Sequence, residues 1–287
     1  MVNETAYTGR EYNFTPRDFD RVRRLIREHA GILLNEGKQD MVYSRIARRI
    51  RAKRLNSFSE YLLQLESDRT EWEEFVNSLT TNLTSFFRED YHFPILADYL
   101  REHRGRKIQL WCSAASTGEE PYSMAITAIQ ALGIMNPSVE IIATDIDTKV
   151  LAEAEAGVYP LERVKRLPAD QLAFFLKGSG NNAGKVKVRP EVRNLVKFKQ
   201  LNLLNAQWDV QGGFDAIFCR NVLIYFDRQT QRQIVEKFVP LLNPHGLLFI
   251  GHSESLAHDR DLFSLRGQTV YENSTHAGSV SRRAHGA

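Results

Sequence analysis

The stretch KIQLWCSAASTGEEP, residues 107–121, decides the fold class of this chain. The apolar run Lys107–Cys112 predicts a buried strand, and the small residues after it predict a tight turn into a helix, Pro121–Leu132. A second short strand, Glu140–Thr144, comes next, and the helix after it ends near Gly157. Short apolar strands that alternate with helices are typical of a mainly parallel sheet covered on both faces, so we expect an α/β domain.

The alternation continues toward the C-terminus. A helix, Gln229–Leu242, precedes the last of the further strands, and a closing antiparallel hairpin is expected around Gly267. The segment of about residues 177–200 breaks the pattern, because it is rich in Gly and Asn and then alternates Val with Lys or Arg. This composition predicts a small inserted antiparallel β-subdomain. The further strands are expected at Val196–Leu201, Ala216–Cys219 and Leu247–Ile250.

Toward the N-terminus the chain has the pattern of helices only. Thr15 and Asp18 form a capping-box pattern at the start of the first helix, and Gly31 ends that helix. Further helices are expected up to residue 80. We therefore predict an N-terminal all-α helical domain at 1–80, an interdomain segment and helix at 81–104, an α/β domain at 105–272 and a disordered tail at 273–287.

The composition is that of an ordinary globular protein, with 43% hydrophobic and 25% charged residues. No apolar run approaches the roughly 20 residues of a membrane-spanning helix, and Met1–Arg10 lacks the apolar segment of a secretory signal. We therefore expect a cytoplasmic protein without membrane insertion. Cys112 and Cys219 are too few for a disulfide framework and lack metal-ligand spacing, so we expect buried thiols and no metal site.

The net charge of +3 is small, but the basic residues are unevenly distributed. Between Met41 and Ser59 every charged side chain is basic, on the side of a predicted helix opposite its apolar residues. A localised basic face favours an acidic partner surface, although a solvated helix face would show the same pattern. The basic residues are Arg45, Arg48, Arg49, Arg51, Lys53 and Arg54.

Ligands of an open parallel sheet bind beyond the carboxyl ends of its strands, so the residues after each strand form the candidate site. After the first strand, the small residues of 113–118 let a ligand approach the backbone, and Glu119 and Glu120 disfavour a diphosphate. After the second strand, Asp145 is placed to accept hydrogen bonds from ribose hydroxyls, because Asp147 is the better helix cap.

Polar side chains also follow the third and fourth strands. Asn202 suits the amide edge of an adenine and Leu203 its face, although an asparagine in a turn is an equally good interpretation. Arg220 and Asn221 follow the fourth strand, and Tyr225 shares their side if the turn is helical, although Tyr225 taken by itself fits an ordinary packing residue better. A neutral loop with a ribose-type acid favours S-adenosylmethionine, while the missing glycine fingerprint disfavours a dehydrogenase.

The chain contains, in this order, the motifs TNLTSFFRE (81–89), WCSAASTGEEPYS (111–123), ATDID (143–147), FCRNVLIYF (218–226), GHSES (251–255) and LRGQTVY (265–271). These motifs resemble those of the CheR-type chemotaxis receptor methyltransferases. The resemblance extends from about Phe14 to Tyr271. It implies an N-terminal all-α domain followed by a Rossmann-like, S-adenosylmethionine-dependent methyltransferase domain with a small β-subdomain inside it.

The resemblance also implies which residues contact the cofactor and which act in methyl transfer. Arg88 and Tyr225 would matter most for transfer, with Arg88 acting mainly on the cofactor and on positioning. The cofactor-binding residues would be Asn82, Thr84 and Arg88 at the methionine end, Glu119 at the charged portion, Asp145 at the ribose, Asn202 and Leu203 at the adenine, and Arg220 and Asn221 near the methyl group.

The implied reaction forms methyl esters on glutamate side chains of bacterial chemoreceptors and releases S-adenosylhomocysteine. The acidic cytoplasmic helices of the receptors would be the partner of the basic helix. The loop at residues 178–184 would belong to the part that binds a receptor C-terminal peptide in some family members. We expect a monomer that binds no nucleic acid.

Two other classes of function remain as alternatives. The first is a degenerate methyltransferase fold that serves as a scaffold, which the intact Arg88, Glu119, Asp145, Asn221 and Tyr225 disfavour. The second is a nucleic-acid methyltransferase, which the arginines suggest. Such enzymes often carry an Asn/Asp-Pro-Pro-aromatic motif where this chain has Arg-Asn-Val-Leu, so the sequence disfavours this class too.

Overall fold

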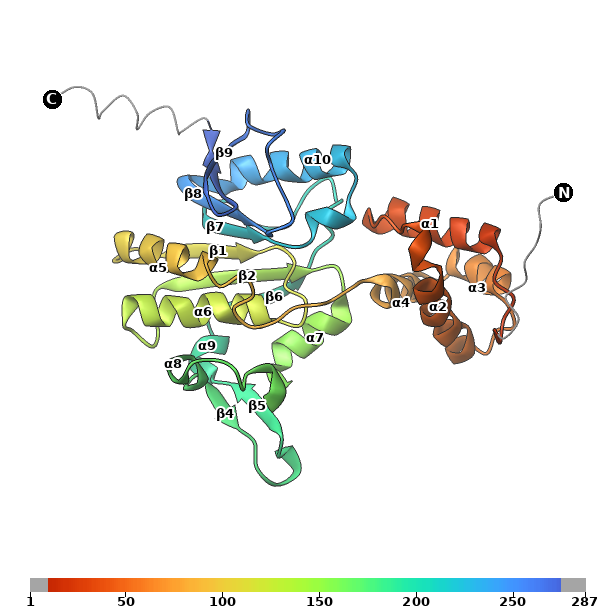
Figure 1. Ribbon diagram of the computed structural model, residues 1–287, viewed down its shortest axis with the longest axis horizontal. Coiled ribbons are helices and arrows are strands. Elements are labelled where there is room, and N and C mark those ends of the chain that lie inside the picture. The colour runs from red at the N-terminus through yellow and green to blue at the C-terminus, as the bar shows by residue number, and fades with distance from the viewer. Residues whose placement is uncertain (1–9, 275–287) are drawn as a thin grey trace. The chain divides into compact units, whose positions relative to one another are not determined.

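The computed structural model describes residues 10–274, and their contacts divide them into two units. The helical unit extends to Thr81 and also includes Tyr225–Asp227. The sheet unit contains Asn82–Ile224 and resumes at Arg228. Figure 1 shows helices in the first unit and a sheet with helices in the second. Of the tail predicted at 273–287, Asn273 belongs to the last strand, and the part from residue 275 lies outside the described residues.

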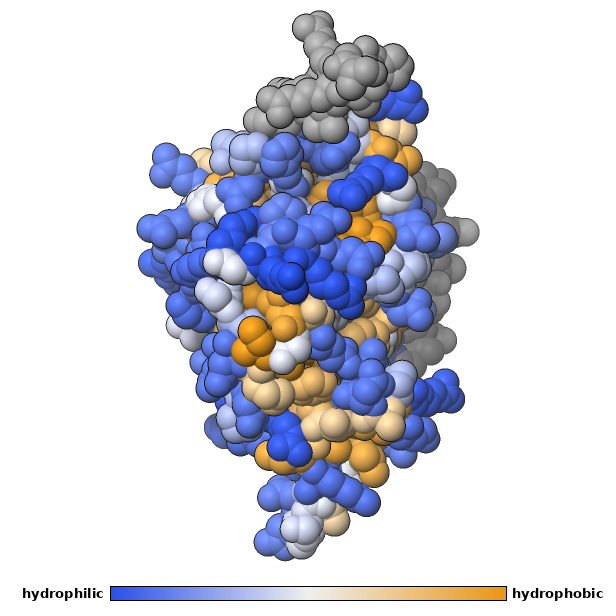
Figure 2. Space-filling view, turned by 90° about the vertical axis from the view of Figure 1, so that its left-hand side faces the viewer, coloured by the Kyte–Doolittle hydropathy of each residue, from blue (hydrophilic) through white to orange (hydrophobic). Residues whose placement is uncertain are grey.

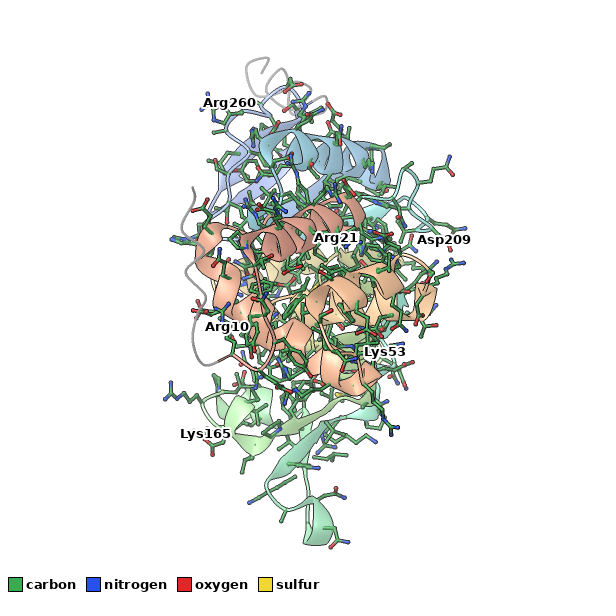
Figure 3. The ribbon with its side chains drawn as sticks, turned by 90° about the vertical axis from the view of Figure 1, so that its right-hand side faces the viewer. Arg10, Arg21, Lys53, Lys165, Asp209 and Arg260 are labelled. Carbon is green, nitrogen blue, oxygen red and sulfur yellow. The ribbon has the colours of Figure 1, made fainter. Side chains whose placement is uncertain are left out.

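The helical unit is built from α1 (Pro16–Ala30), η1 (Glu36–Lys38), α2 (Gln39–Lys53), α3 (Phe58–Leu65) and α4 (Arg69–Leu79). Thr15 caps α1 through the predicted capping box, and Gly31, with a φ of 71°, ends it. The four-residue spacing of Val42, Ile46 and Ile50 puts all three on one face of α2, where they are fully buried. Figure 3 shows the side chains of this unit, with Arg21 on α1 and Lys53 at the end of α2.

The main sheet of the second unit is formed by β1 (Ile108–Cys112), β2 (Val139–Asp145), β6 (Val196–Gln200), β7 (Phe214–Cys219), β8 (Leu242–Ile250), β9 (Phe263–Gly267) and β10 (Val270–Asn273). Within the described chain its order is β6-β2-β1-β7-β8-β10-β9. The pairs from β6 to β8 are parallel, and β9 and β10 form the predicted antiparallel hairpin. The strand order reverses between β1 and β7, so the carboxyl edge at these strands is the topological switch point.

Helices cover both faces of this sheet. Cys112 on β1 shares a core with residues of α5 and α6, whereas its neighbour Trp111 packs against Phe238 of α10, with 5.4 Å between the ring centroids. Cys112 and Trp111 face opposite sides because successive side chains of a β-strand alternate between the two faces of the sheet. Figure 1 shows these helices around the sheet. They are α5 (His92–Glu102), α6 (Glu119–Leu132), α7 (Thr148–Ala156) and α10 (Arg228–Phe238). The short helices α8 (Ala169–Leu172) and α9 (Pro190–Arg193) belong to the segment between α7 and β6.

Two of these helices differ from the prediction by two or more residues at one end. α6 begins at Glu119 instead of Pro121, because Gly118 adopts a φ of 95° and turns the chain into the helix earlier. α10 ends at Phe238 instead of Leu242. Pro240 has no N–H for the helical ladder, and the chain continues as the 3-10 helix η5 (Val239–Leu241).

The small antiparallel sheet is present, but it does not occupy the predicted range of about 177–200. It consists of β3 (Val158–Pro160), β5 (Lys185–Val188) and β4 (Phe175–Lys177), in that order. It therefore begins earlier than predicted and ends at Val188, and residues 196–200 belong to the main sheet. Strands of three residues are too short to show a period, so the sequence pattern did not separate them from loops.

The surface of the described residues carries scattered apolar side chains. The face drawn in Figure 2 mixes hydrophilic regions with smaller hydrophobic patches. In the sheet unit, exposed apolar residues include Ile134 and Met135 after α6 and Leu83 in the segment before α5. Among residues 10–274, no helix has both the length and the apolar character that crossing a bilayer requires.

Candidate active site

The ribose-type acid predicted at the end of β2 is held by backbone groups. Asp145 is 8% exposed, and its two carboxylate oxygens accept hydrogen bonds from Ser116 N at 2.8 Å and Asp147 N at 3.0 Å. Ser116, with a φ of 49°, lies in the turn after β1, so this contact ties the ends of the two strands together. Burial raises the pKa of the Asp145 carboxyl to about 6, although both N–H groups act in the opposite direction.

Asn82 lies beside this acid. Its Nδ2 donates to Asp147 Oδ2 at 2.9 Å, and its carbonyl accepts from Ser116 Oγ at 3.4 Å. Asp147 also caps α7, because Oδ1 accepts from Lys149 N and Val150 N. The prediction that Asp147 caps this helix is therefore confirmed. The role of Asp145 toward a ligand stays a prediction.

Glu119, at the start of α6, is fully buried. Its carboxylate accepts from the Thr117 hydroxyl at 2.6 Å, and Arg163 Nη1 lies 3.4 Å away. The same Arg163 nitrogen donates to Thr84 O at 3.0 Å, so Arg163 links Glu119 to the segment that carries Asn82. Burial raises the pKa of Glu119, and Thr117 and Arg163 offset this only in part.

These two carboxyl groups indicate the charge of the ligand that fits. The pKa values of both Asp145 and Glu119 are raised, which means that the chain supplies too few positive charges and donors to stabilise their ionised forms fully. A ligand with hydroxyl donors at Asp145 and a cationic group near Glu119 would supply what is missing. The residues therefore fit a nucleoside cofactor with a cationic end and disfavour a diphosphate.

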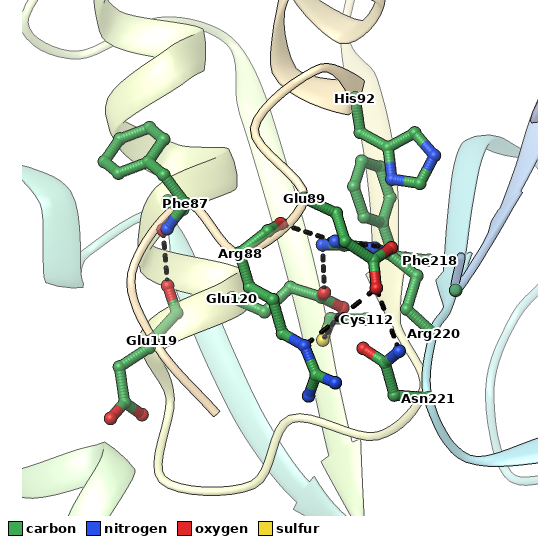
Figure 4. Close-up of polar contacts among 12 residues, drawn as sticks. Phe87, Arg88, Glu89, His92, Cys112, Glu119, Glu120, Phe218, Arg220 and Asn221 are labelled. Atoms are coloured by element: carbon green, nitrogen blue, oxygen red, sulfur yellow. Dashed lines mark hydrogen bonds and ion pairs between the residues drawn. The ribbon is translucent and has the colours of Figure 1, made fainter. Parts of the chain in front are cut away.

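A second cluster joins the segment before α5 to the end of β7 (Figure 4). The Arg220 side chain is fully buried and forms ion pairs with Glu120 at 2.5 Å and Glu89 at 3.1 Å. It also donates to the carbonyl of Arg88. Burial alone would lower the pKa of Arg220, but Glu120 and Glu89 raise it above its ordinary value. Nη1 and Nη2 of its guanidinium are thus used within the protein, whereas the buried Nε has no hydrogen-bond partner among the described residues.

Asn221 follows Arg220 in a left-handed conformation with a φ of 57°. Its Nδ2 donates to Glu89 Oε1 at 3.0 Å, and its backbone N donates to Glu254 Oε2 at 2.8 Å. Glu254, which is buried, also accepts from Gly251 N at 2.6 Å in the turn after β8. The carboxylates of Glu89 and Glu254 therefore join three segments of the chain: the one before α5, the turn after β7 and the turn after β8.

The comparisons with known proteins agree with this geometry. Residues 17–80 match the family model described as CheR methyltransferase, all-alpha domain, and residues 82–272 match CheR methyltransferase, SAM binding domain. The chain belongs to the CheR methyltransferase family. It is therefore an S-adenosylmethionine-dependent methyltransferase of chemotaxis, and the predicted fold class, a helical domain before a Rossmann-like domain with a small β-sheet, is confirmed.

Named relatives in this family cover most of the chain. It is 52% identical over 269 residues to Chemotaxis protein methyltransferase 2 of Pseudomonas aeruginosa, which covers 93% of this chain and 96% of that protein. It is also 52% identical to the Chemotaxis protein methyltransferase of Salmonella typhimurium, over 88% of each chain. The Chemotaxis protein methyltransferase of Escherichia coli is 52% identical, with 88% of this chain and 89% of that protein covered.

The remaining predicted residues of this CheR-family chain lie in different surroundings. Asn202 follows β6, and its Oδ1 accepts from Leu204 N at 2.9 Å, which is the turn geometry that the sequence left open. Leu203 is 6% exposed. Thr84 is half-buried. Tyr225 groups with the helical unit, where its carbonyl accepts from Leu33 N at 2.8 Å.

The sequence reasoning assigned no role to several residues of the site. Glu89 and Glu254 lie within the motifs named above, and Glu120 was interpreted only as part of an acidic pair with Glu119. Arg163 lies in η2 (Leu161–Arg163) of the inserted segment, far along the chain from Glu119. Their position within the long motifs was the one feature of the sequence that could have indicated a role for Glu89, Glu120 and Glu254. No local pattern marked Arg163.

Proposed function

We propose that this CheR-family chain transfers a methyl group from S-adenosylmethionine to glutamate side chains of bacterial chemoreceptors and releases S-adenosylhomocysteine. Family membership supports the reaction and the receptor substrate. The observation that carries the cofactor site is the pair of buried acids, Asp145 and Glu119, at the switch point of the sheet. Both have raised pKa values that hydroxyl donors and a cationic group would relieve.

We assign the cofactor's parts to this edge of the sheet as follows. Asp145 would accept from the ribose hydroxyls, and Glu119 would face the cationic portion. Arg88 Nη1 donates to Leu83 O at 2.9 Å, and the side chain is 36% exposed, so part of its guanidinium is open to a ligand. The full set of residues proposed to border the cofactor is Asn82, Thr84, Arg88, Glu119, Asp145, Asn202, Leu203 and the backbone of Arg220 and Asn221.

Methyl transfer to a carboxylate requires the protein to align donor and acceptor more than it requires acid–base catalysis. When bound, S-adenosylmethionine supplies a methyl group already activated by its sulfonium. A receptor glutamate with an ordinary pKa of about 4.3 is ionised at neutral pH, so no general base is needed. Arg88 and Tyr225 would orient the reacting groups, and well-aligned reactants account for a large part of such rate enhancements. A very strong clamp on the carboxylate would stabilise the ground state and slow transfer.

The helical unit would dock the receptor. Of the basic residues on α2, Arg45 donates to Thr80 O at 2.6 Å, while Arg49 and Lys53 pair with Glu71 at 2.8 Å and 3.2 Å. These three are therefore used inside the unit. We propose that the exposed Arg48, Arg51 and Arg54 form the docking face for acidic cytoplasmic helices of receptors.

Two further parts of the proposal follow from the family. A receptor C-terminal peptide would bind at the small sheet of β3, β5 and β4. The protein would act in the cytoplasm as a monomer, without nucleic acid or a metal ion. Among residues 10–274, no three His, Cys, Asp or Glu side chains are arranged as a metal-binding group.

The test is calorimetric titration with S-adenosylhomocysteine on the wild type, Asp145→Ala and a matched control, Asp209→Ala, whose side chain is 94% exposed. We expect one-to-one binding by the wild type and by the control, and loss of binding in Asp145→Ala. Absence of binding by folded wild type would contradict the proposal and favour a scaffold. Transfer of radioactive methyl groups from S-adenosylmethionine to receptor glutamates then tests the acceptor.

A further inference from the structure

Arg88, the residue proposed to act in transfer, lies between two strained residues. Phe87 and Glu89 both have a φ of 51°, in the left-handed region that residues other than glycine rarely occupy. Such conformations persist only where surrounding contacts hold them, and they are concentrated at functional sites. The direction in which Arg88 leaves the backbone is set by these two neighbours. The contacts that hold them therefore determine where its guanidinium lies.

The Phe87 side of this turn is held by ordinary packing. Phe87 N donates to Ser123 Oγ at 2.9 Å, and its ring packs edge-on against Phe93 with 5.0 Å between centroids. Both partners lie on helices of the same unit, α6 and α5. Nothing in these contacts reaches the turns after β7 and β8.

The Glu89 side of the turn is held by one carboxylate with four partners. Oε1 accepts from Asn221 Nδ2 at 3.0 Å, and Oε2 accepts from His252 N at 3.0 Å and pairs with Arg220 Nη2 at 3.1 Å. The fourth partner is Arg88 itself, whose Nε lies 3.9 Å from Oε1. The Glu89 side chain is 13% exposed. Figure 4 shows it above Arg220 and Asn221, next to Arg88. A single side chain therefore ties the Arg88 turn to the ends of two strands.

The charge of Glu89 is part of this arrangement. Burial alone would raise the pKa of its carboxyl, but Asn221, Arg220 and His252 N more than offset burial and hold the pKa below its ordinary value. Glu120 shares the Arg220 guanidinium, and burial raises the pKa of Glu120 despite that pair. Of the two carboxylates on Arg220, Glu89 is thus the one that the site keeps ionised most firmly.

We propose that Glu89 is a positioning residue for methyl transfer, whose ionised carboxylate fixes the Arg88 turn against the turns after β7 and β8. This inference rests on the proposed function, because Arg88 must act in transfer for its position to matter. Glu89 contacts Arg88, Arg220 and Asn221 of the residues proposed to border the cofactor, but neither Asp145 nor Glu119. Those two acids have their own partners in Ser116 and Thr117, so the larger part of the proposed cofactor site does not depend on Glu89. The consequence is a separation of effects: loss of the Glu89 charge lowers kcat more than it weakens cofactor binding.

The chain offers a matched control at the other end of β7. Asp215 lies on β7, five residues before Arg220, is 1% exposed and accepts from Arg106 Nη2 at 2.6 Å, Gln109 N at 2.9 Å and Asn243 Nδ2 at 2.9 Å. It resembles Glu89 in burial, in its arginine partner and in its backbone partner. It lies toward the amino end of the parallel strand, away from the carboxyl edge that carries the site. Asp215→Asn therefore reports what losing such a carboxylate does to stability alone.

The experiment compares wild type, Glu89→Gln and Asp215→Asn as full-length proteins. Receptor methylation gives kcat at saturating S-adenosylmethionine, calorimetry gives Kd for S-adenosylhomocysteine, and thermal melting reports folding. We expect Glu89→Gln to lower kcat about 10- to 100-fold, as small misplacements of catalytic groups do, with Kd changed less than about threefold. We expect Asp215→Asn to lower the melting temperature at least as much as Glu89→Gln does and to keep the wild-type kcat.

Several outcomes would overturn the inference. A wild-type kcat in folded Glu89→Gln would do so, as would an equal loss of kcat in Asp215→Asn, which would show a merely structural role. If Glu89→Gln does not fold, Glu89→Asp keeps the charge and shortens the reach to His252 N and Asn221. Its kcat should then fall with Kd retained, and a wild-type kcat in that variant would overturn the inference. A wild type that binds no S-adenosylhomocysteine would instead contradict the proposed function.

Discussion

Each unit of the molecule contains an arginine that pairs with more than one carboxylate, half-buried in the helical unit and fully buried in the sheet unit, and the two arrangements differ in what they hold. In the helical unit, Arg49 binds both oxygens of Glu71 at 2.8 and 2.9 Å and pairs with Glu74 at 2.6 Å, while the Tyr61 hydroxyl donates to Glu71 at 2.9 Å. We call these residues, with Lys53, the Arg49 network. In the sheet unit, Arg220, Glu89, Glu120 and Asn221 form the Arg220 network.

The Arg49 network connects regular helices to one another. Its members come from α2, α3 and α4, and the contacts given above join side chain to side chain. The Arg220 network connects turns, and it includes backbone groups: the carbonyl of Arg88 and the N–H of His252. Helices would keep their conformation without such contacts, whereas left-handed residues such as Glu89 and Asn221 would not. The comparison indicates that the first network serves stability and the second serves the placement of site residues.

Removing the central arginine of the Arg220 network is expected to have the largest effect. Arg220→Met would leave Glu89 and Glu120 partly buried without their cation, which costs about 3–5 kcal/mol of folding free energy. Urea unfolding measures this loss. Arg232→Met is the control, because Arg232 also has several acidic partners but is 32% exposed, so solvent screens its ion pairs and the variant should lose much less stability. Similar losses of stability in Arg220→Met and Arg232→Met would show that burial does not determine how much such an arginine contributes.

Glu71→Gln separates the two networks by function. Gln keeps the shape but loses the charge-assisted bonds to Arg49 and Lys53, so we expect a loss of about 1.5–3 kcal/mol in urea unfolding. The Kd for S-adenosylhomocysteine should stay at the wild-type value. A change of Kd in a fully folded Glu71→Gln protein would show that the Arg49 network acts on the cofactor site as well, and the contrast drawn above would then fail.

Gly251→Ala sharpens the comparison by crowding the turn after β8. A Cβ at this position would lie 2.5 Å from Asn221 Nδ2 and 2.7 Å from Glu254 Oε2, closer than these atoms tolerate. We expect a loss of about 1–3 kcal/mol of stability together with a lower kcat, because Asn221 must move away from Glu89. Gly105→Ala, where a Cβ meets no atom within 4 Å, shows the cost of the backbone alone, since its φ is +92°. A normal kcat in Gly251→Ala would indicate that the turn tolerates displacement.

The pH dependence of cofactor binding tests the part of the site outside the Arg220 network. Asp145 has a pKa of about 6 in the free protein, and ribose hydroxyls would donate to its ionised form. The affinity for S-adenosylhomocysteine should therefore be flat above about pH 6 and fall by up to about tenfold per pH unit below it. Calorimetry between pH 8 and pH 5 measures this. In Asp145→Asn the dependence should weaken to the part that Glu119 contributes, because the pKa of Glu119 is also raised. A flat wild-type profile down to pH 5 would contradict the ribose role.

The smallest effect is expected on the surface of the helical unit, outside the Arg49 network. Reversing the charges of Arg48 and Arg54 should raise KM for receptor about 2- to 10-fold and leave KM for S-adenosylmethionine unchanged, since exposed ion pairs contribute little each. Arg101→Glu with Arg104→Glu, two exposed positions at the end of α5, is the control. Equal changes in both KM values, or an equal effect of the control, would remove the docking face from the proposal.

Much of the fold was predictable because its signals are local. Thr15 with Asp18 predicted the start of α1, and Asp147 predicted the cap of α7. The apolar run before Ser113 predicted β1. By contrast, Val158–Pro160 and Phe175–Lys177 form strands of three residues, whose pairing with β5 depends on contacts and not on a period. The extent of the small sheet therefore could not be predicted correctly.

The basic helix shows the same division in its side chains. Arg45, Arg49 and Lys53 follow one another at four-residue spacing, so the sequence placed them on one face of α2. Which face points inward depends on the acids and carbonyls that α4 presents, and the structure turns these three toward Glu71 and Thr80. For this reason the docking face proposed above keeps only the exposed Arg48, Arg51 and Arg54.

The sequence by itself determined the alternation of strands and helices, and it determined which polar residues stand at strand ends, among them Asp145 and Asn221. Periodicity and helix caps act over a few residues, so they can be seen in the sequence. Only the tertiary structure decided that Glu89 meets Asn221 and His252, which lie 132 and 163 positions further along the chain. Such pairs form because a parallel sheet brings the turns after its strands to one edge, and that proximity follows from the order of strands in space.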